Sequence, residues 1–352
     1  MIYGLPYLML GLATLIAISR QREWTKPVAF VVLGFFAVLA VARGDVGTDT
    51  LTYETLVGVY IEETGWIGIE PGFIAYVRLA HLVTDNAVLI TRGLSLVFFA
   101  LILIFLWRAS RDETFVLLAY FAPIYLVQMS MNGLRIGIAT AAFVCAMQLF
   151  RRGRNRNAVA YLVLAISFHV SIVFAIVLMA LTRIEISRAK TLFLPVLGLM
   201  AAMIVAITAQ GYLEDKVTDY ATIVSPGVFS GLSPVGRILI ILFSAVTLPI
   251  SRADKRWMLV TILTATVISY GVAINSYGGL RLLEIIASVA PSLLLMRIDP
   301  STPLNRRFRL GLALAGLLGG LNTLRGMFAS ANLEGSPFVP YNFLTEAIIS
   351  RG

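Results

Sequence analysis

The sequence predicts an all-α, polytopic membrane protein with about twelve transmembrane helices and one short re-entrant or interfacial helix. Of the 352 residues, 59% are hydrophobic and only 13% are charged, whereas roughly a quarter of the residues of a soluble domain are charged. Apolar runs close to the ~20 residues that cross a hydrocarbon core recur along the chain. Since no charged segment is long enough for a separate soluble domain, residues 1–352 are expected to form a single integral membrane domain.

The predicted spans follow the apolar runs of the sequence in order. They cover residues 2–18, 28–42, 87–107, 114–130, 134–150, 158–168, 170–182, 191–209, 236–250, 257–274, 281–296 and 310–328. The first run is followed by Arg20, Arg22 and Lys26 and has no basic leader, the reverse of a cleavable signal peptide. We therefore expect it to remain as a span, with the N-terminus on the outer side.

The positions of Lys and Arg predict which turns face the cytoplasm, because cytoplasmic loops of membrane proteins are rich in both. Nineteen of the 28 basic residues fall in six short turns: 20–26, 108–113, 151–156, 183–190, 252–256 and 297–309. This arrangement requires the run 158–182 to be two short helices, hinged at Phe168 and His169. It places both termini on the outer side of the membrane.

The apolar run 72–84 is too short to span the bilayer comfortably and carries Arg78 and His81. These two residues fall at i and i+3, so they share one face of a helix. Because an ionisable residue within an apolar membrane segment usually serves function, Arg78 is a candidate for substrate binding.

Nine basic residues are not explained by membrane orientation, and eight of them are arginines. They are Arg43, Arg78, Arg92, Arg135, Lys216, Arg237, Arg281, Arg325 and Arg351. The planar guanidinium suits bidentate recognition of phosphate. We therefore expect the outer face to hold an anion, with help from the outer loops 43–71 and 210–236 and the outer tail 329–352.

Several kinds of soluble chemistry are excluded by the motifs that the sequence lacks. There is no phosphate-binding glycine loop, no dinucleotide fingerprint and no HExxH motif. With two histidines, and Cys145 alone within an apolar run, we predict neither a metal site nor a cofactor. The net charge of +9 is spread over short loops, so it favours membrane topology over nucleic-acid binding.

Three polar positions are candidates for chemistry, each with a structural alternative. Asp49 lies in a glycine-punctuated turn and is either a general base or the cap of a helix at 50–62. Glu70 precedes Pro71 at a predicted helix start, where it either caps the helix or binds substrate. His169 lies at the predicted hinge and is either a packing group or a catalytic base.

An ordered set of short motifs resembles the EpsG-type branch of the Wzy-like bacterial polysaccharide polymerases. The motifs are GTDTLTY at 47–53, EPGF at 70–73, MNGLR at 131–135, SFHVS at 167–171 and PYNF at 340–343. By this resemblance the functional residues are Asp49, Asn132, Arg135, His169 and Ser171, on a polymerase architecture of the GT-C type. Family members commonly have Gln after the arginine, whereas this chain has Ile136.

The resemblance implies a glycosyltransferase of the bacterial inner membrane that joins undecaprenyl-diphosphate-linked oligosaccharides on the outer face. Membrane lipid and a chain-length regulator are the further partners that it implies. A flippase or other transporter of lipid-linked sugars, or a glycan ligase, is the alternative.

Under the polymerase hypothesis, each remaining candidate residue has an expected role. Arg135 is expected to stabilise the leaving diphosphate, supported by Arg78, Arg92 and Arg281. Asp49 or His169 is expected to be the base, and Tyr220 is expected to stack on a sugar.

Overall fold

The computed structural model describes residues 3–18, 25–62, 70–183, 227, 229–329, 338, 341 and 343–345. Within these ranges the regular structure is helical, apart from an isolated β-bridge between Arg43 and Phe343. The predicted span 191–209 and Tyr220 lie outside the described residues. The predicted all-α class is thus confirmed for the part of the chain that the structure describes.

The helices follow one another along the chain as the apolar runs predict. They are α1 (Gly4–Ile18), α2 (Thr25–Val41), α3 (Thr50–Glu62), α4 (Pro71–His81), α5 (Ala87–Arg108), α6 (Arg111–Val116), α7 (Ala122–Val127), α8 (Leu134–Arg151), α9 (Asn155–Phe168), α10 (Ile172–Arg183), α13 (Leu232–Ala245), α14 (Arg252–Ala273), α15 (Tyr277–Leu295) and α16 (Arg306–Ala329). Two π-helical turns, Leu117–Phe121 and Gln128–Asn132, join α6 and α7 into one continuous helix, Arg111–Asn132.

Five helices of the described chain are long and apolar enough to cross a membrane: α5, Arg111–Asn132, α8, α14 and α15. Shorter apolar helices, of 10–17 residues, occur at α1, α2, α10 and α13. Several apolar helices therefore make this a multi-pass membrane protein. The twelve-span topology and the GT-C architecture stay predictions.

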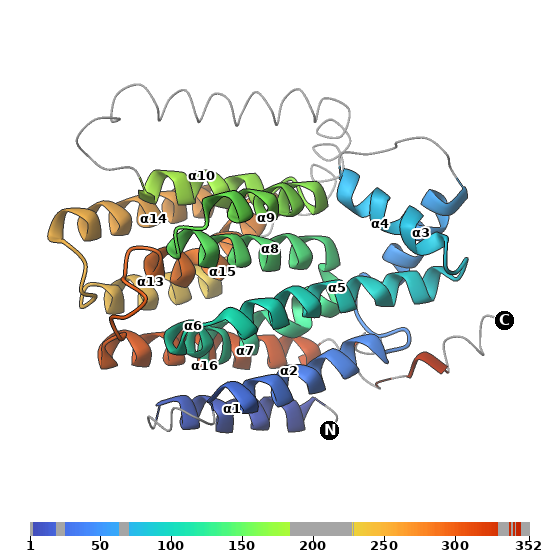
Figure 1. Cartoon of the computed structure of the whole chain (residues 1–352), viewed down its shortest axis with the longest axis horizontal. Coiled ribbons are helices and arrows are strands. Elements are labelled where there is room, and N and C mark those ends of the chain that lie inside the picture. The colour runs from blue at the N-terminus through green and yellow to red at the C-terminus, as the bar shows by residue number, and fades with distance from the viewer. Residues whose placement is uncertain are drawn as a thin grey trace.

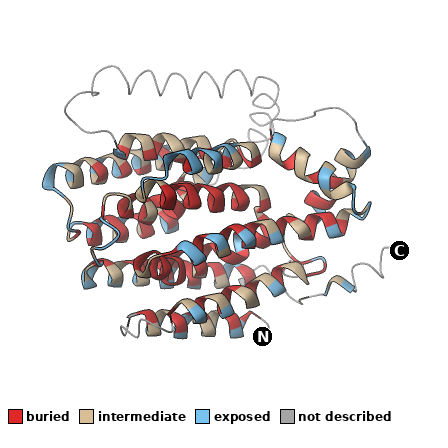
Figure 2. Ribbon diagram, viewed as in Figure 1, coloured by how far each residue is buried: buried red, intermediate tan, exposed pale blue. Residues whose placement is uncertain are grey.

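The helices form a bundle in which α8 and the helix Arg111–Asn132 are central (Figure 1). In their most apolar windows, 78% and 89% of the residues are buried inside the protein, compared with 28% for α14 (Figure 2). The short helices α3 and α4 lie at one end of the bundle, beside the beginning of α5 (Figure 1). Asp49 directly precedes α3, and Glu70 directly precedes α4.

Close approach of the central helices depends on glycine. A Cβ added at Gly137 of α8 would overlap the carbonyl oxygen of Met129, and one at Gly316 of α16 would overlap that of Ala119. Small residues let helix backbones pack this closely in membrane proteins. Gly137 and Gly316 therefore serve close helix packing.

The predicted break near residue 169 is present. Helix α9 ends at Phe168, and His169 takes an extended conformation with φ −158° and ψ 117°. Helix α10 then starts at Ile172, whose amide donates to the His169 carbonyl at 3.2 Å. The hinge therefore places the histidine at the junction of two short helices.

At the other end of α8, a buried carboxylate neutralises two arginines. Glu113 completes a capping box with Ser110. It also pairs with Arg151 at 3.3 Å and with Arg152 at 2.8 Å, and accepts a hydrogen bond from Gln148 at 3.2 Å. A basic cluster expected only to orient the helix thus also ties α8 to α6.

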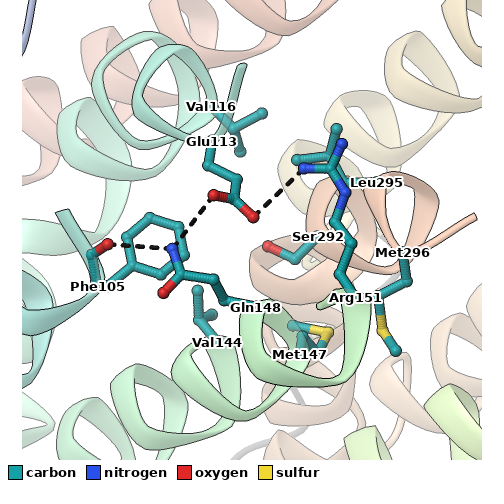
Figure 3. Close-up of a pocket in the computed structure, with 10 residues that line it drawn as sticks. All are labelled: Phe105, Glu113, Val116, Val144, Met147, Gln148, Arg151, Ser292, Leu295 and Met296. Carbon is teal, nitrogen blue, oxygen red and sulfur yellow. Dashed lines mark hydrogen bonds and ion pairs between the residues drawn. The ribbon is translucent and has the colours of Figure 1, made fainter. Parts of the chain in front are cut away.

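A small cavity lies beside this carboxylate, lined by Phe105, Val144, Gln148, Ser292 and their neighbours (Figure 3). Arg151 also borders it and donates to the carbonyl of Ile298 at 3.0 Å. Along α8, Arg151 lies about 24 Å from Arg135 at 1.5 Å per residue. The cavity is therefore remote from the residues proposed for chemistry.

We predict that Glu113→Gln lowers the free energy of unfolding by about 3 kcal/mol or more, because it leaves two arginines without their buried counter-charge. Thermal unfolding of the purified protein in detergent measures the effect. Asp254→Asn is the control, because Asp254 is a partly exposed acid that accepts a hydrogen bond from the Ser251 hydroxyl. Equal loss of stability in the two variants would show that Glu113 has no special role.

Candidate functional site

Three residues that are far apart in the sequence meet at a single carboxylate. Glu70 precedes α4, Arg135 lies in the first turn of α8, and His169 lies at the α9–α10 hinge. Arg135 Nη1 donates to Glu70 Oε2, and His169 Nδ1 is hydrogen-bonded to Glu70 Oε1. Glu70, Arg135 and His169 are called the Glu70 cluster below.

The role of Glu70 differs from the capping role weighed for it. It occupies the residue before α4 with Pro71 at the first helical position, yet its side chain makes no cap hydrogen bond. Both carboxylate oxygens are instead used by Arg135 and His169. The helix start therefore sets the place of the carboxylate, and α8 and the hinge supply its partners.

Burial and charge act in opposite directions on Glu70, whose side chain is only 5% exposed. Burial by itself would raise the pKa of Glu70. The hydrogen bond and charge of His169, together with the charge of Arg135, outweigh burial and hold this pKa below its ordinary value. Glu70 is therefore an ionised carboxylate at neutral pH.

The ionised carboxylate fixes the proton on the imidazole of His169. Because a carboxylate only accepts hydrogen bonds, Nδ1 must carry the hydrogen that points at Glu70. In the neutral ring, Nε2 then holds the free lone pair. Within the described chain Nε2 has no hydrogen-bond partner, so it is available to a substrate.

Two aromatic rings flank the guanidinium of Arg135. Its carbon Cζ lies 5.7 Å from the centre of the Tyr53 ring and 5.4 Å from that of the Phe73 ring. Contacts of this kind attract a cation to the ring face and restrict its position. The Arg135 side chain nevertheless keeps 28% of its surface exposed, so it is accessible from the site.

The motif that follows Glu70 needs its glycine for close packing. A Cβ at Gly72 would overlap the side chain of Ser167, at the end of α9, and lie 2.9 Å from its backbone carbon. Ser167 lies two residues before His169. Gly72 thus lets the first turn of α4 approach the hinge, which brings Glu70 to the histidine.

The turn that carries Asp49 packs on Asn132. Gly47 has φ +112°, a conformation that favours glycine, and a Cβ there would lie 2.8 Å from Asn132 Oδ1. The amide of Thr48 donates to the same oxygen at 3.1 Å. Asn132 therefore holds the Asp49 turn beside the start of α8, while Asp49 itself accepts from the Thr48 hydroxyl at 3.0 Å.

Arg92 is buried and stabilises the chain that leads into this turn. It is 2% exposed, pairs with Glu54 at 2.8 Å, and donates to the carbonyls of Arg43 and Gly44 at 2.9 and 2.7 Å. Its guanidinium thus joins α5, α3 and the start of the outer loop. We therefore leave Arg92 out of the proposed phosphate site, in contrast to the sequence-based expectation.

The outer tail reaches the same turn from the other side. The amide of Leu344 donates to the Ala42 carbonyl at 2.8 Å, and the Tyr341 hydroxyl donates to that of Leu39 at 2.6 Å. Arg43 is fully buried beneath and donates to Ser95 Oγ at 2.9 Å. Tyr341 and Leu344 therefore help to fix the end of α2, from which the chain leads into the loop that carries Asp49.

The remaining sequence candidates lie around this cluster or apart from it. Arg78 is on α4, two turns after Glu70, and His81 pairs with the exposed Asp85 at 3.0 Å. Ser171 is half-buried in the hinge. Arg281 is on α15, which contributes no residue to the Glu70 cluster.

The described side chains do not form a metal site. No group of three or more His, Cys, Asp or Glu residues gathers among them in a way that could hold a metal ion. The expectation that the protein needs no metal or cofactor stays a prediction.

In a comparison with protein families, the chain matches the model of the EpsG family over residues 27–307. The chain belongs to the EpsG family. Because EpsG is a family of Wzy-like polymerases, this membership indicates a polysaccharide polymerase type of role in a membrane. No curated protein and no solved structure matches the chain.

Ile136, the residue that follows Arg135, is partly buried against the apolar core. Glu70, a polar partner of Arg135, lies 65 residues earlier in the chain. The sequence motif alone gave no indication of that pairing.

We predict that Glu70→Gln destabilises the protein in a pH-dependent way. Because the folded-state pKa of Glu70 is lowered, its ion pairs contribute fully above the ordinary carboxyl pKa of 4.5 and are lost as the pH falls below it. Thermal unfolding in detergent should give a difference between the two proteins at neutral pH that shrinks as the pH falls below about 4.5. A difference that grows as the pH falls below about 4.5 would contradict the ion pairing.

Proposed function

We propose that this EpsG protein is a membrane glycosyltransferase that polymerises undecaprenyl-diphosphate-linked oligosaccharide repeats on the outer face of the bacterial plasma membrane. The observation that carries the proposal is the Glu70 cluster, which joins an accessible arginine and a carboxylate-oriented histidine. Transfer of a glycan from a lipid diphosphate needs a stabilised leaving group and an activated hydroxyl. The two partners of Glu70 match these two needs.

Arg135 is proposed to stabilise the diphosphate that leaves the donor. Negative charge develops on the phosphate oxygens as the bond to the anomeric carbon breaks, and a cation placed beforehand lowers the energy of that state. The contacts with Glu70, Tyr53 and Phe73 hold the guanidinium in place while part of it remains exposed. Arg78 is a further cation on α4 that we assign to the same diphosphate.

His169 is proposed to activate the acceptor. Its Nε2 accepts the proton of an acceptor sugar hydroxyl, whose oxygen forms the new bond to the anomeric carbon of the donor. The bond from that carbon to the diphosphate oxygen breaks, and undecaprenyl diphosphate leaves. Glu70 stabilises the imidazolium formed at His169, which then returns its proton to solvent.

Asp49 is the second candidate for the base. Its turn is fixed to Asn132 at the start of α8, three residues before Arg135. Tyr53, one turn further along α3, lies against the guanidinium of Arg135. The carboxylate is partly exposed, so it could reach a hydroxyl that enters from the outer side.

Polymerase activity is separated from transport and ligation by an assay with the purified protein. A polymerase in detergent lengthens lipid-linked repeats supplied as the single substrate. A flippase gives no longer product in detergent, and a ligase needs a different acceptor. The absence of lengthened product under conditions where the protein stays folded would overturn the proposal.

We predict that Arg135→Gln and Arg135→Lys each reduce the polymerisation rate by about a hundredfold to a thousandfold, because the diphosphate loses its planar donor. Single repeats should accumulate on the lipid, as seen by chromatography of the lipid fraction. Arg252→Lys is the matched control, since Arg252 is an exposed arginine at the start of α14. Polymer of normal length from both Arg135 variants would remove Arg135 from the mechanism.

We predict that His169→Gln lowers kcat by about a hundredfold to ten thousandfold and flattens the dependence of the rate on pH. Asp49→Asn should act mainly on KM if Asp49 only contacts the acceptor. Steady-state rates across pH 5 to 9, at saturating and limiting substrate, separate these outcomes. The reverse pattern, with the pH dependence lost only in Asp49→Asn, would transfer the role of base to Asp49.

A further inference from the structure

Helix α15 carries a polar stripe near its beginning that the Glu70 cluster does not use. Tyr277, Arg281 and Glu284 stand at i, i+4 and i+7, so they lie on one face of the helix. Tyr277 is 39% exposed, Arg281 is exposed, and the side chain of Glu284 is 46% exposed. We call these three residues the outer stripe of α15.

Beyond the stripe, residues 285–291 of α15 are all buried. Beside the stripe, a Cβ at Gly279 would overlap the backbone of Ala273 in α14, and Leu283 packs near Gly231. The exposed stripe is therefore followed directly by a buried stretch of the same helix, and α14 packs beside it at Gly279.

A buried arginine holds the carboxylate of the stripe from behind. Arg237 of α13, whose side chain is 5% exposed, donates to Glu284 Oε1 at 2.7 Å. It also donates to the Tyr125 hydroxyl at 2.9 Å and to the carbonyl of Ser233 at 3.3 Å. Glu284 has no other partner among the described residues, so its second oxygen is left to accept hydrogen bonds.

The stripe is unsuited to contact with lipid chains. Charged side chains in membrane helices face the protein interior or a water-filled cavity, because hydrocarbon cannot solvate them. By the predicted topology the beginning of α15 lies on the outer side, where a polymerase meets its glycan. A sugar offers an apolar ring face and several hydroxyls. The tyrosine ring can stack on that face, and the guanidinium and the second carboxylate oxygen can hydrogen-bond the hydroxyls.

We infer that the outer stripe of α15 binds the oligosaccharide of the lipid-linked substrate through its sugar hydroxyls and ring faces. The inference rests on the proposed polymerase function and names a glycan subsite for it, separate from the diphosphate at Arg135. Tyr277 stacks on a sugar face, and Glu284 accepts hydroxyl hydrogen bonds while Arg237 holds it in place. Arg281, expected from the sequence to bind diphosphate, is assigned here to the glycan.

The test measures binding of two probes to the full-length protein in detergent. The first probe is the oligosaccharide repeat released from its lipid diphosphate by mild acid, and the second is farnesyl diphosphate. Tyr277→Ala and Glu284→Gln should each weaken binding of the oligosaccharide by about tenfold to a hundredfold. Both variants should bind farnesyl diphosphate as the wild type does, and Arg135→Gln should show the opposite pattern.

Asp85→Asn is the matched control, because Asp85 is an exposed acid that contacts His81 and lies outside the stripe. Glu284→Gln leaves Arg237 without its carboxylate partner and could unfold the protein, which a melting curve would show. In that case the test rests on Tyr277→Ala. Wild-type protein that does not bind the oligosaccharide, unchanged binding in Tyr277→Ala, or weakened binding of farnesyl diphosphate instead would each overturn the inference. Failure of the proposed function would show separately, as wild-type protein that binds the oligosaccharide without lengthening lipid-linked repeats.

Discussion

One buried carboxylate, Glu70, joins the three parts of the candidate site. It sits at the beginning of α4 and is shared between a guanidinium from α8 and an imidazole from the α9–α10 hinge. A buried carboxylate without such partners would be costly, and the guanidinium of Arg135 alone would lack its counter-charge. The position of α4 against α9 is therefore as much a part of the site as the residues that would touch substrate.

The arginines of this chain serve several distinct physical purposes. Arg92 pairs with Glu54 and donates to backbone carbonyls of the loop before α3. Arg151 pairs with Glu113 at the opposite end of the bundle, and Arg237 pairs with Glu284. In each case the buried charge is neutralised and its donors fix an element in place. Arg135 differs from Arg92 and Arg151 because a substantial part of its side chain remains exposed beside its carboxylate.

The proposed chemistry follows from this division of tasks. The diphosphate end of the substrate needs a cation that is fixed but reachable, and the acceptor hydroxyl needs a base whose proton position is defined. The Glu70 cluster supplies both within one set of contacts. A polymerase must also hold the oligosaccharide of its substrate, and we assign this third task to the outer stripe of α15.

The helical class, the order of the described helices, the hinge at His169 and the short helix after Glu70 could all be predicted from the sequence, because apolar length and the placement of Pro, Gly and charge act locally. The motifs also singled out Arg135, His169 and Asn132. The folded structure was needed to show that Glu70 links Arg135 to His169, that Arg92 is internal, and that Glu284 is held by Arg237. These pairings join residues 38 to 99 positions apart, and local pattern carries no information about which distant charges meet.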